Sequence, residues 1–264
     1  MNNVDVAVIN SGGRGMRFRP FTNTIPKEML PFNGVPAIEY VIDECINASI
    51  DKIIVTTSRE NDQIKLYLES REKYANRLYF NFENFEDTAH GIWICTIDNR
   101  KMYGNATPIL ALENLLKHKK FAVLFGDDVI YEKNGIGELI RVYKDKKATS
   151  AIAMKKIPIQ YMHDFGNLKI DENDRVHSFV QKPQCIEDVV SEYAVISRLI
   201  LDDSIFEYID ITNTELKEVD LGNALDLQAK EKLVVAYELT GQWLSVDSPS
   251  RYFLSQKKII HNYI

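Results

Sequence analysis

Residues 4–32, VDVAVINSGGRGMRFRPFTNTIPKEMLPF, contain the strongest structural signal in the chain. This stretch opens with a short apolar, β-branched run, Val4–Ile9, which predicts a buried strand. The run leads into Ser11-Gly12-Gly13-Arg14-Gly15, and glycines at a strand end let the backbone approach a ligand with its N–H groups exposed. Because Arg17 and Lys27 follow within the same loop, the stretch is typical of a polyphosphate-binding loop. A glycine-rich turn with two solvated cations is the alternative at this point.

Composition places the chain among ordinary globular proteins. Its 264 residues are 45% hydrophobic and 27% charged, which is enough for one substantial core. The net charge of −6 argues against binding to nucleic acid, but a nucleotide pocket needs only a few local cations. The 3 cysteines are widely spaced, which predicts reduced thiols and no structural zinc. Without a signal peptide or an apolar run of bilayer length, we expect a cytoplasmic protein that does not bind membranes.

Helix and strand patterns alternate through the first 155 residues. Pro36–Asn47 predicts an amphipathic helix and Asp51–Thr57 a buried strand. The pattern continues with predicted helices at 61–71, 109–117 and 136–147 and predicted strands at 78–82, 121–125 and 150–155. This order predicts an α/β fold with a doubly wound, mostly parallel sheet. Such sheets bind ligands at the carboxyl ends of their strands, where the glycine-rich loop and Gly126-Asp127-Asp128 both fall.

The pattern changes after residue 160. A polar turn between 166–170 and 175–180 predicts a β-hairpin. Strands are predicted at 193–196 and 233–239, and helices at 203–209, at 223–232 and through Ile259 at the end of the chain. Because no repeat or linker separates the two halves, we expect a single domain over residues 1–264.

The acidic pair Asp127-Asp128 follows an apolar strand. A strand-end turn, where Gly and Asp are favoured, explains it without any function. Alternatively, one carboxylate binds Mg²⁺, a hard cation that prefers oxygen ligands and accompanies phosphates. Magnesium beside Arg17 and Lys27 suits phosphoryl or nucleotidyl transfer, in which catalysis is mainly positioning and charge stabilisation.

Other site types lack support in the sequence. The five histidines show no metal-ligand spacing, and no serine has a Gly-x-Ser-x-Gly context. The opening loop lacks both the Gly-Lys-Ser/Thr ending of a P-loop and a complete Gly-x-Gly-x-x-Gly. Serine hydrolase, P-loop and dinucleotide-binding functions are therefore not favoured.

Two motifs in the opening stretch resemble those of sugar-1-phosphate nucleotidyltransferases. They are Gly12-Gly13-Arg14-Gly15-Met16-Arg17-Phe18 and Pro26-Lys27-Glu28-Met29-Leu30-Pro31. The second motif is most similar to that of the bacterial UTP–glucose-1-phosphate uridylyltransferases, or UDP-glucose pyrophosphorylases. The likeness extends along nearly the whole chain, through 34–40, 104–106, 126–128, 165–166, 181–183 and 218–224.

This resemblance implies a Rossmann-like nucleotidyltransferase fold with a small sugar-binding part that contains a β-hairpin. Residues 1–155 would mainly bind the nucleotide, and residues 156–264 mainly the sugar. The implied reaction is a Mg²⁺-dependent, in-line attack of the glucose 1-phosphate oxygen on the α-phosphorus of UTP, which releases pyrophosphate without a covalent intermediate. The implied partners are these small molecules and further copies of the chain, in a dimer or tetramer.

The resemblance also assigns roles to individual residues. Arg17 would hold the β- and γ-phosphates, Lys27 would bridge the α-phosphate and the sugar phosphate, and Asp127 would bind Mg²⁺. The other nucleotide-binding residues would be Ser11, Gly12, Gly13, Gly15 and Gly104. The sugar phosphate would be bound by Asp128, Gly166, Gln181 and Lys182.

The chain departs from the family pattern at three places. It has Gln181 where the family has Glu, and the glutamine that reads the base is absent, its position falling near Ile97. At the second metal ligand a direct alignment gives Ser245, but Val-Asp-Ser-Pro resembles the Val-Asp-Thr-Pro of sugar-acid cytidylyltransferases, so we predict Asp247. Two alternatives therefore stay open: the same chemistry with another nucleotide or sugar (a dTDP- or CDP-sugar), or a degenerate homologue that only binds a sugar nucleotide.

Overall fold

The computed structural model describes residues 4–58, 62–98, 103–211 and 218–261. The chain divides into two compact units, each assembled from segments that are distant in sequence. The first unit comprises Asp5–Asp98, Leu124–Asn134 and Gly241–Ile264. The second unit comprises Met1–Val4, Asn99–Val123 and Gly135–Thr240. The units are interleaved in sequence.

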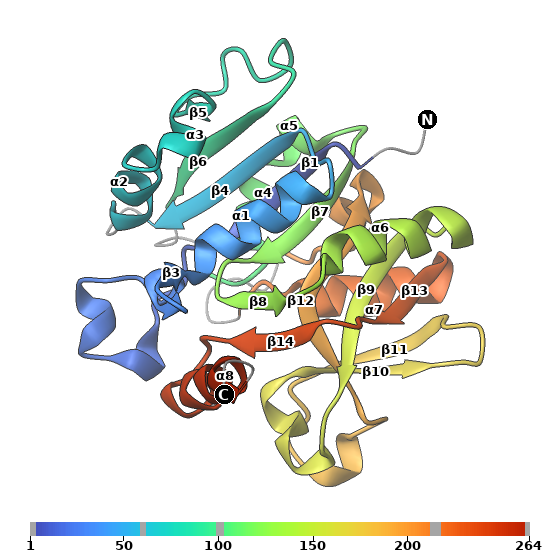
Figure 1. The fold of residues 1–264 in the computed structure, drawn as a ribbon. Coiled ribbons are helices and arrows are strands. Elements are labelled where there is room, and N and C mark those ends of the chain that lie inside the picture. The colour runs from blue at the N-terminus through green and yellow to red at the C-terminus, as the bar shows by residue number, and fades with distance from the viewer. Residues whose placement is uncertain (1–3, 59–61, 99–102, 212–217, 262–264) are drawn as a thin grey trace. The chain divides into compact units, whose positions relative to one another are not determined.

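A parallel sheet forms the centre of the first unit (Figure 1). β1 (Val6–Asn10) pairs with β4 (Lys52–Ser58), β4 with β6 (Gly91–Ile97), and β6 with β5 (Leu78–Tyr79), all in parallel. β1 and β4 are buried along nearly their whole length, as expected for parallel strands covered on both faces. The predicted α/β class with a mostly parallel sheet is confirmed.

Helices and short strands complete the first unit. The predicted helix after the opening loop is present as α1 (Ala37–Asn47), and α2 (Gln63–Glu69) and α3 (Glu72–Ala75) follow β4. β2 (Pro31–Phe32) pairs with β3 (Val35–Pro36), and β8 (Asp128–Tyr131) pairs antiparallel with β14 (Gln242–Ser245). α8 (Pro249–His261) ends the described chain and contacts the opening stretch: Tyr252 Oη and Gln256 Nε2 both donate hydrogen bonds to the Pro31 carbonyl, at 2.7 and 2.6 Å.

The second unit contains a mixed sheet. β9 (Ser150–Lys156) lies between β12 (Tyr193–Asp202), which is antiparallel to it, and β13 (Val234–Glu238), which is parallel. The predicted hairpin is present as β10 (Gly166–Ile170) and β11 (Val176–Gln181), and β10 also pairs with β12. The helices are α4 (Thr107–Ala111), α5 (Glu113–Leu116), α6 (Gly135–Lys146) and α7 (Leu221–Glu231). β7 (Lys120–Phe125) starts in the second unit and ends in the first.

Some predicted elements differ from those observed. The single helix predicted at 109–117 is two short helices, because Leu112 leaves the helical conformation at φ −104° and ψ 7°. The helix predicted at 203–209 is a 3₁₀ helix, Asp203–Tyr208. The strand predicted at 78–82 has only two residues, whereas that predicted at 193–196 extends to Asp202. β6, β8 and β14 were not predicted at all.

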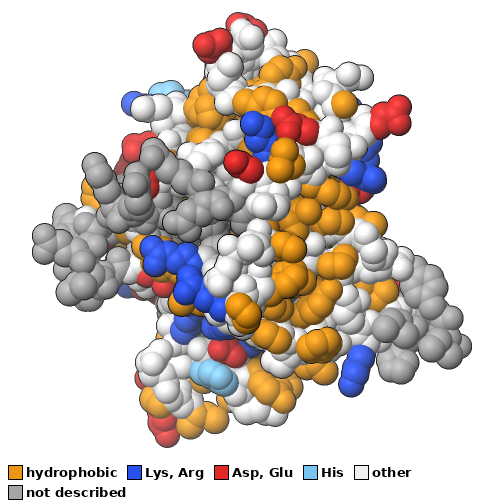
Figure 2. Space-filling model, turned by 90° about the vertical axis from the view of Figure 1, so that its left-hand side faces the viewer, with side chains coloured by type: hydrophobic (Ala, Val, Ile, Leu, Met, Phe, Trp, Pro, Cys, Tyr) orange, Lys and Arg blue, Asp and Glu red, His pale blue; other side chains and the backbone are white. Residues whose placement is uncertain are grey.

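Large hydrophobic residues remain on the surface of the described chain, among them Met16, Phe21, Phe253 and Leu254. Figure 2 shows one face, on which hydrophobic side chains are interspersed with charged and uncharged ones. Within the described residues, no helix combines the length and the apolar character that crossing a bilayer requires.

Candidate active site

The glycine-rich loop follows β1 directly, as predicted. Ser11 N–H continues the strand pattern by donating to the Thr56 carbonyl at 3.0 Å. Gly15 then adopts a left-handed φ of 57°, and a Cβ at this position would lie 2.7 Å from Thr22 Cγ2. The Thr22 hydroxyl donates to the Gly15 carbonyl at 2.7 Å, so glycine is required both by the backbone conformation and by this close approach.

Lys27 lies beneath this loop and forms an ion pair with Asp127. A Cβ at Gly13 would lie 3.6 Å from Lys27 Cε, which places the lysine stem against the loop backbone. Lys27 Nζ donates to Asp127 Oδ2, and both side chains are largely buried. Burial alone would lower the pKa of Lys27, but the charges of Asp127 and Glu28, the hydrogen bond to Asp127 and the charge of Asp247 raise it above its usual value. Lys27 is therefore held as a cation.

A second charged group joins Arg17 to the segment after β14. Asp247 accepts a hydrogen bond from Arg17 Nη1 through Oδ1 and one from Arg251 Nη1 through Oδ2, each at 2.5 Å. Because Asp247 also raises the pKa of Lys27, its carboxylate acts on the same cation as Asp127. A backbone hydrogen bond also joins the two segments, since Val246 N–H donates to the Asp127 carbonyl at 2.8 Å. Arg17, Lys27, Asp127 and Asp247 thus form one charged cluster in the first unit.

Ser245, the alternative to Asp247, is turned into the interior. Only 5% of its surface is exposed, and its N–H donates to Ser255 Oγ at 3.0 Å. Its own hydroxyl accepts a hydrogen bond from Asp247 N–H at 3.2 Å. Ser245 therefore fixes the backbone that carries Asp247, and the negative charge beside Arg17 belongs to Asp247.

The charged cluster suits a small, hard divalent cation. Among the described residues no group of three or more His, Cys, Asp or Glu side chains could hold a metal alone. Asp127 and Asp247 provide two carboxylates, and Mg²⁺ is commonly bound by one or two carboxylates together with phosphate oxygens of the substrate. The donor set therefore fits a metal that arrives with a nucleotide, and it does not fit a permanent, protein-only site.

Asp128 is placed differently from its neighbour. It is the first residue of β8, 8% exposed, and its Oδ1 accepts a hydrogen bond from Trp243 Nε1 at 3.1 Å. This contact joins β8 to β14 by side chains as well as by the backbone.

Glu28 belongs to this region and was given no role by the sequence analysis. It is 1% exposed, and its Oε2 has no hydrogen-bond partner among the described residues. Burial raises the pKa of Glu28 to about 8; the neighbouring Lys27 opposes this change and Asp127 adds to it. The available signal was its place beside Lys27 in the Pro-Lys-Glu-Met-Leu-Pro motif.

The remaining predicted site residues lie in the second unit. Gly104 has a φ of 134°, and a Cβ there would be 2.1 Å from the Val219 carbonyl oxygen. Gly166 pairs with Gln181 across the β10–β11 hairpin. Lys182 follows with a φ of 46°, and its N–H donates to the Phe165 carbonyl at 3.0 Å.

Asp220 joins these segments and was not singled out from the sequence. Its Oδ2 accepts hydrogen bonds from Gln181 Nε2 and from Asn105 Nδ2, each at 2.8 Å. The position where a base-reading glutamine was sought, Ile97, is the buried last residue of β6, and its hydrocarbon side chain has no group that could form a hydrogen bond with a base.

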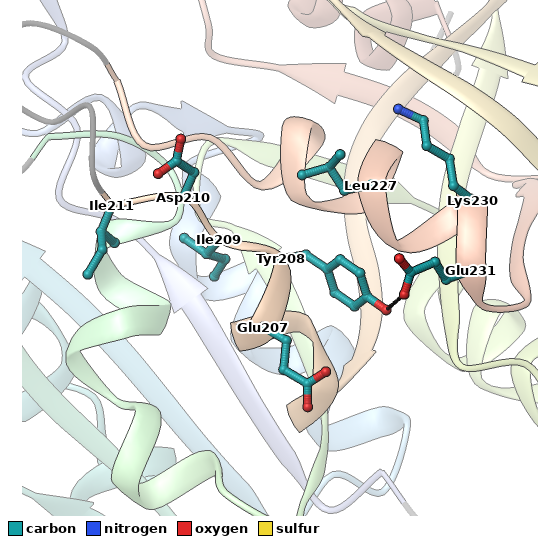
Figure 3. Close-up of a pocket in the computed structure, with 8 residues that line it drawn as sticks. All are labelled: Glu207, Tyr208, Ile209, Asp210, Ile211, Leu227, Lys230 and Glu231. Carbon is teal, nitrogen blue, oxygen red and sulfur yellow. Dashed lines mark hydrogen bonds between the residues drawn. The ribbon is translucent and has the colours of Figure 1, made fainter.

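A separate cavity of about 630 Å³ lies between the 3₁₀ helix Asp203–Tyr208 and α7 in the second unit (Figure 3). Across it, Tyr208 Oη donates to Glu231 Oε2 at 2.9 Å. No predicted site residue lines this cavity.

A parallel sheet with a glycine-rich loop at the end of β1, the largely buried Lys27–Asp127 pair and the more exposed Arg17–Asp247 pair is the arrangement of a nucleotidyltransferase type of protein. The nucleotidyl transferase family model matches residues 6–262. The chain therefore belongs to the nucleotidyl transferase family.

Curated relatives and solved structures agree with this assignment. The chain is 28% identical over 255 residues to a UTP–glucose-1-phosphate uridylyltransferase of Staphylococcus haemolyticus, covering 91% of this chain and 87% of that protein. It is 28% identical over 248 residues to the protein of the same name from Mycoplasma pneumoniae, covering 88% and 81%. These relatives confirm the resemblance found in the motifs.

Two solved structures show the same fold. A UDP-glucose pyrophosphorylase complexed with UDP-glucose superposes with a TM-score of 0.81 at 24% identity, covering 98% of this chain and 100% of that one. A UTP-bound UGPase from Acinetobacter baumannii superposes with a TM-score of 0.79 at 22% identity, covering 98% and 93%.

Proposed function

We propose that the protein joins UTP and glucose 1-phosphate to give UDP-glucose and pyrophosphate. The observation that carries this proposal is the charged cluster, in which Lys27 is paired with Asp127, Arg17 is paired with Asp247, and both carboxylates keep Lys27 charged. The names of the relatives supply the choice of substrates.

In this proposal Lys27 binds the α-phosphate of UTP and the phosphate of the sugar, so that its charge brings two anions together. Arg17 binds the β- and γ-phosphates and stabilises the charge that develops on the leaving pyrophosphate. The backbone of Ser11, Gly12, Gly13 and Gly15 lies against the nucleotide. The sugar-phosphate oxygen attacks the α-phosphorus as the bond to the pyrophosphate oxygen breaks, so no covalent intermediate with the protein forms.

Asp127 and Asp247 would hold Mg²⁺ in this proposal. Bound there, the ion would neutralise negative charge on the phosphates and polarise the α-phosphoryl group. Arg17 and Arg251 each donate a hydrogen bond to one oxygen of Asp247 in the structure. One of these two hydrogen bonds would have to break for Asp247 to bind the ion.

The other predicted site residues would bind the base and the sugar. Gly104 would lie against the base, and Asp128, Gly166, Gln181 and Lys182 would bind glucose 1-phosphate. We further propose a single functional domain over residues 1–264, which the family match over residues 6–262 supports. Residues 1–155 would mainly bind the nucleotide and residues 156–264 mainly the sugar.

We also infer a cytoplasmic homo-oligomer, a dimer or tetramer. Cys45, Cys95 and Cys185 are free thiols, which suits a reducing compartment. Light scattering of the purified protein would give the number of copies, and a monomer at micromolar concentration would exclude the oligomer.

A second candidate function keeps the chemistry and changes the substrate. The buried Ile97 and the amide of Gln181 favour it, because neither supplies the group that the family pattern has. A screen of UTP, dTTP, CTP, ATP and GTP against several sugar 1-phosphates, read as pyrophosphate release, compares the two. Preference for UTP with glucose 1-phosphate supports the first function, and preference for another pair supports the second. Calorimetric binding of UDP-glucose without turnover at any Mg²⁺ concentration would instead identify a degenerate, binding-only homologue.

A further inference from the structure

Asp220 accepts four hydrogen bonds through one buried carboxylate. Its Oδ1 receives the backbone N–H groups of Gly222 and Asn223, at 2.7 and 3.2 Å, and so caps α7. Its Oδ2 receives the side-chain amides of Asn105 and Gln181, each at 2.8 Å. Since the first two bonds suffice for a helix cap, the other two call for a separate explanation.

The bond to Asp220 fixes the orientation of the Gln181 amide. A carboxylate only accepts hydrogen bonds, so Gln181 must present its Nε2 to Asp220 and its Oε1 elsewhere. That oxygen lies on the side of Gly166, where an added Cβ would be 3.1 Å away. The described part of the chain supplies no hydrogen-bond donor to Oε1, and the side chain is only half-buried. Gln181 therefore presents a fixed, available acceptor.

The same carboxylate also anchors the segment around Gly104. Asn105 Nδ2 donates to Asp220, while Asn105 Oδ1 accepts the Leu221 N–H at 2.7 Å. The backbone pairs as well, since Val219 N–H donates to the Tyr103 carbonyl at 2.8 Å. Gly104 is thereby held flush against Val219, with no room for a side chain.

We propose that Asp220 is a positioning residue that sets both the Gln181 acceptor for a sugar hydroxyl and the Gly104 segment for the base. This inference rests on the proposed function, which places the sugar at Gln181 and the base at Gly104. Asp220 supplies, next to Gln181, the negative charge that position 181 itself lacks. The pair works in one direction only, with the amide donating and the carboxylate accepting.

A double-mutant cycle tests the pair. Gln181→Glu sets two carboxylates against each other, so we expect KM for glucose 1-phosphate to rise roughly tenfold while kcat changes less than threefold. Asp220→Asn keeps a good helix cap but allows the Gln181 amide to flip. KM for glucose 1-phosphate should therefore rise about threefold to tenfold. In Gln181→Glu/Asp220→Asn the introduced amide donates to the introduced carboxylate, and KM for glucose 1-phosphate should return to within about threefold of wild type. KM for UTP should stay raised, because Asn105 Nδ2 still faces an amide in place of the carboxylate.

Gln160→Glu is the matched control, because it makes the same exchange at an exposed position in the same unit. Its KM values should equal those of wild type. Additive effects in the double variant, or KM values unchanged while only the melting temperature falls, would show that Asp220 is a helix cap and nothing more.

The failure of this inference is distinguishable from that of the proposed function. A wild-type protein that turns over no sugar phosphate refutes the proposed reaction, and the cycle is then measured as calorimetric binding of UDP-glucose. A rescue by the double variant still supports the pairing. Equal or absent binding in all variants overturns it.

Discussion

Lys27 and Asp127, 100 residues apart in sequence, form a largely buried ion pair. Lys27 comes from the loop after β1 and Asp127 from the turn between β7 and β8, and the carboxylate keeps the lysine charged although burial opposes charge. Such a pair contributes little net stability when complete, but removing one partner leaves a buried charge uncompensated.

Replacing Lys27 should therefore affect catalysis and stability together. In Lys27→Ala we expect pyrophosphate release to fall by about 10²–10³-fold, because a charge that positions both phosphates is lost. The free energy of unfolding should fall by on the order of 3 kcal/mol, because Asp127 remains buried without its partner. Lys27→Arg retains the charge and should fold normally, yet lose activity because a guanidinium does not reproduce a compact ammonium group. The exposed Lys257→Ala serves as control, and full activity in Lys27→Ala would remove Lys27 from the mechanism.

Asp247 and Ser245 should differ in their effect on the metal requirement. Asp247→Asn removes one of the two carboxylates near Lys27, so the Mg²⁺ concentration for half-maximal activity should rise roughly tenfold or more. Ser245→Ala removes only the hydroxyl that accepts the Asp247 N–H, and a change of less than threefold is expected. Magnesium titrations of both variants at saturating substrate decide the point. The reverse ranking would make Ser245 the ligand position.

Glu28 should make stability depend on pH. Its folded-state pKa of about 8 is above that of an unfolded glutamate, near 4.5, so between these values the folded protein binds more protons than the unfolded one. The contribution of Glu28 is therefore fully present below about pH 4.5 and is lost as the pH rises towards 8, by at most ~1.4 kcal/mol per pH unit.

Urea unfolding of wild type and Glu28→Gln between pH 6 and pH 9 measures this effect. The variant cannot ionise at position 28, so its curve should be flatter across this range. Parallel curves for the two proteins would mean that Glu28 does not titrate in the folded state in this range.

Alanine substitutions at Gly104 and Gly34 separate the cost of a steric clash from the cost of backbone strain alone. Both glycines have positive φ values, 134° and 78°, but a Cβ at Gly34 meets nothing within 4 Å whereas one at Gly104 would be 2.1 Å from the Val219 oxygen. Gly34→Ala should cost only the conformational strain, about 1–2 kcal/mol. Gly104→Ala adds a backbone clash and should cost about 3 kcal/mol or more, with weaker nucleotide binding. Chemical denaturation and calorimetry with UTP compare the two, and equal costs would contradict the packing at Val219.

Local sequence predicted the elements whose patterns are strong. Val6–Asn10 and Lys52–Ser58 are apolar β-branched runs, and the helix Ala37–Asn47 has an apolar face, so propensity and burial agree. β6 was not predicted, although Ile92, Trp93 and Ile94 are buried, because the segments on either side of this short apolar run are polar. β8 and β14 are four residues each and gain their stability by pairing with one another, which no local pattern reveals.

The family and the residue types of the site could be predicted from the sequence, because the glycine-rich loop and the Pro-Lys-Glu-Met-Leu-Pro motif are local and long. Which charged side chains contact one another depends on the folded structure. Asp247, not Ser245, lies beside Arg17, Glu28 is a buried acid with a raised pKa, and Asp220 joins Asn105 to Gln181. These relationships depend on distances between segments far apart in the chain, and electrostatic and hydrogen-bond energies follow distance and burial rather than sequence order.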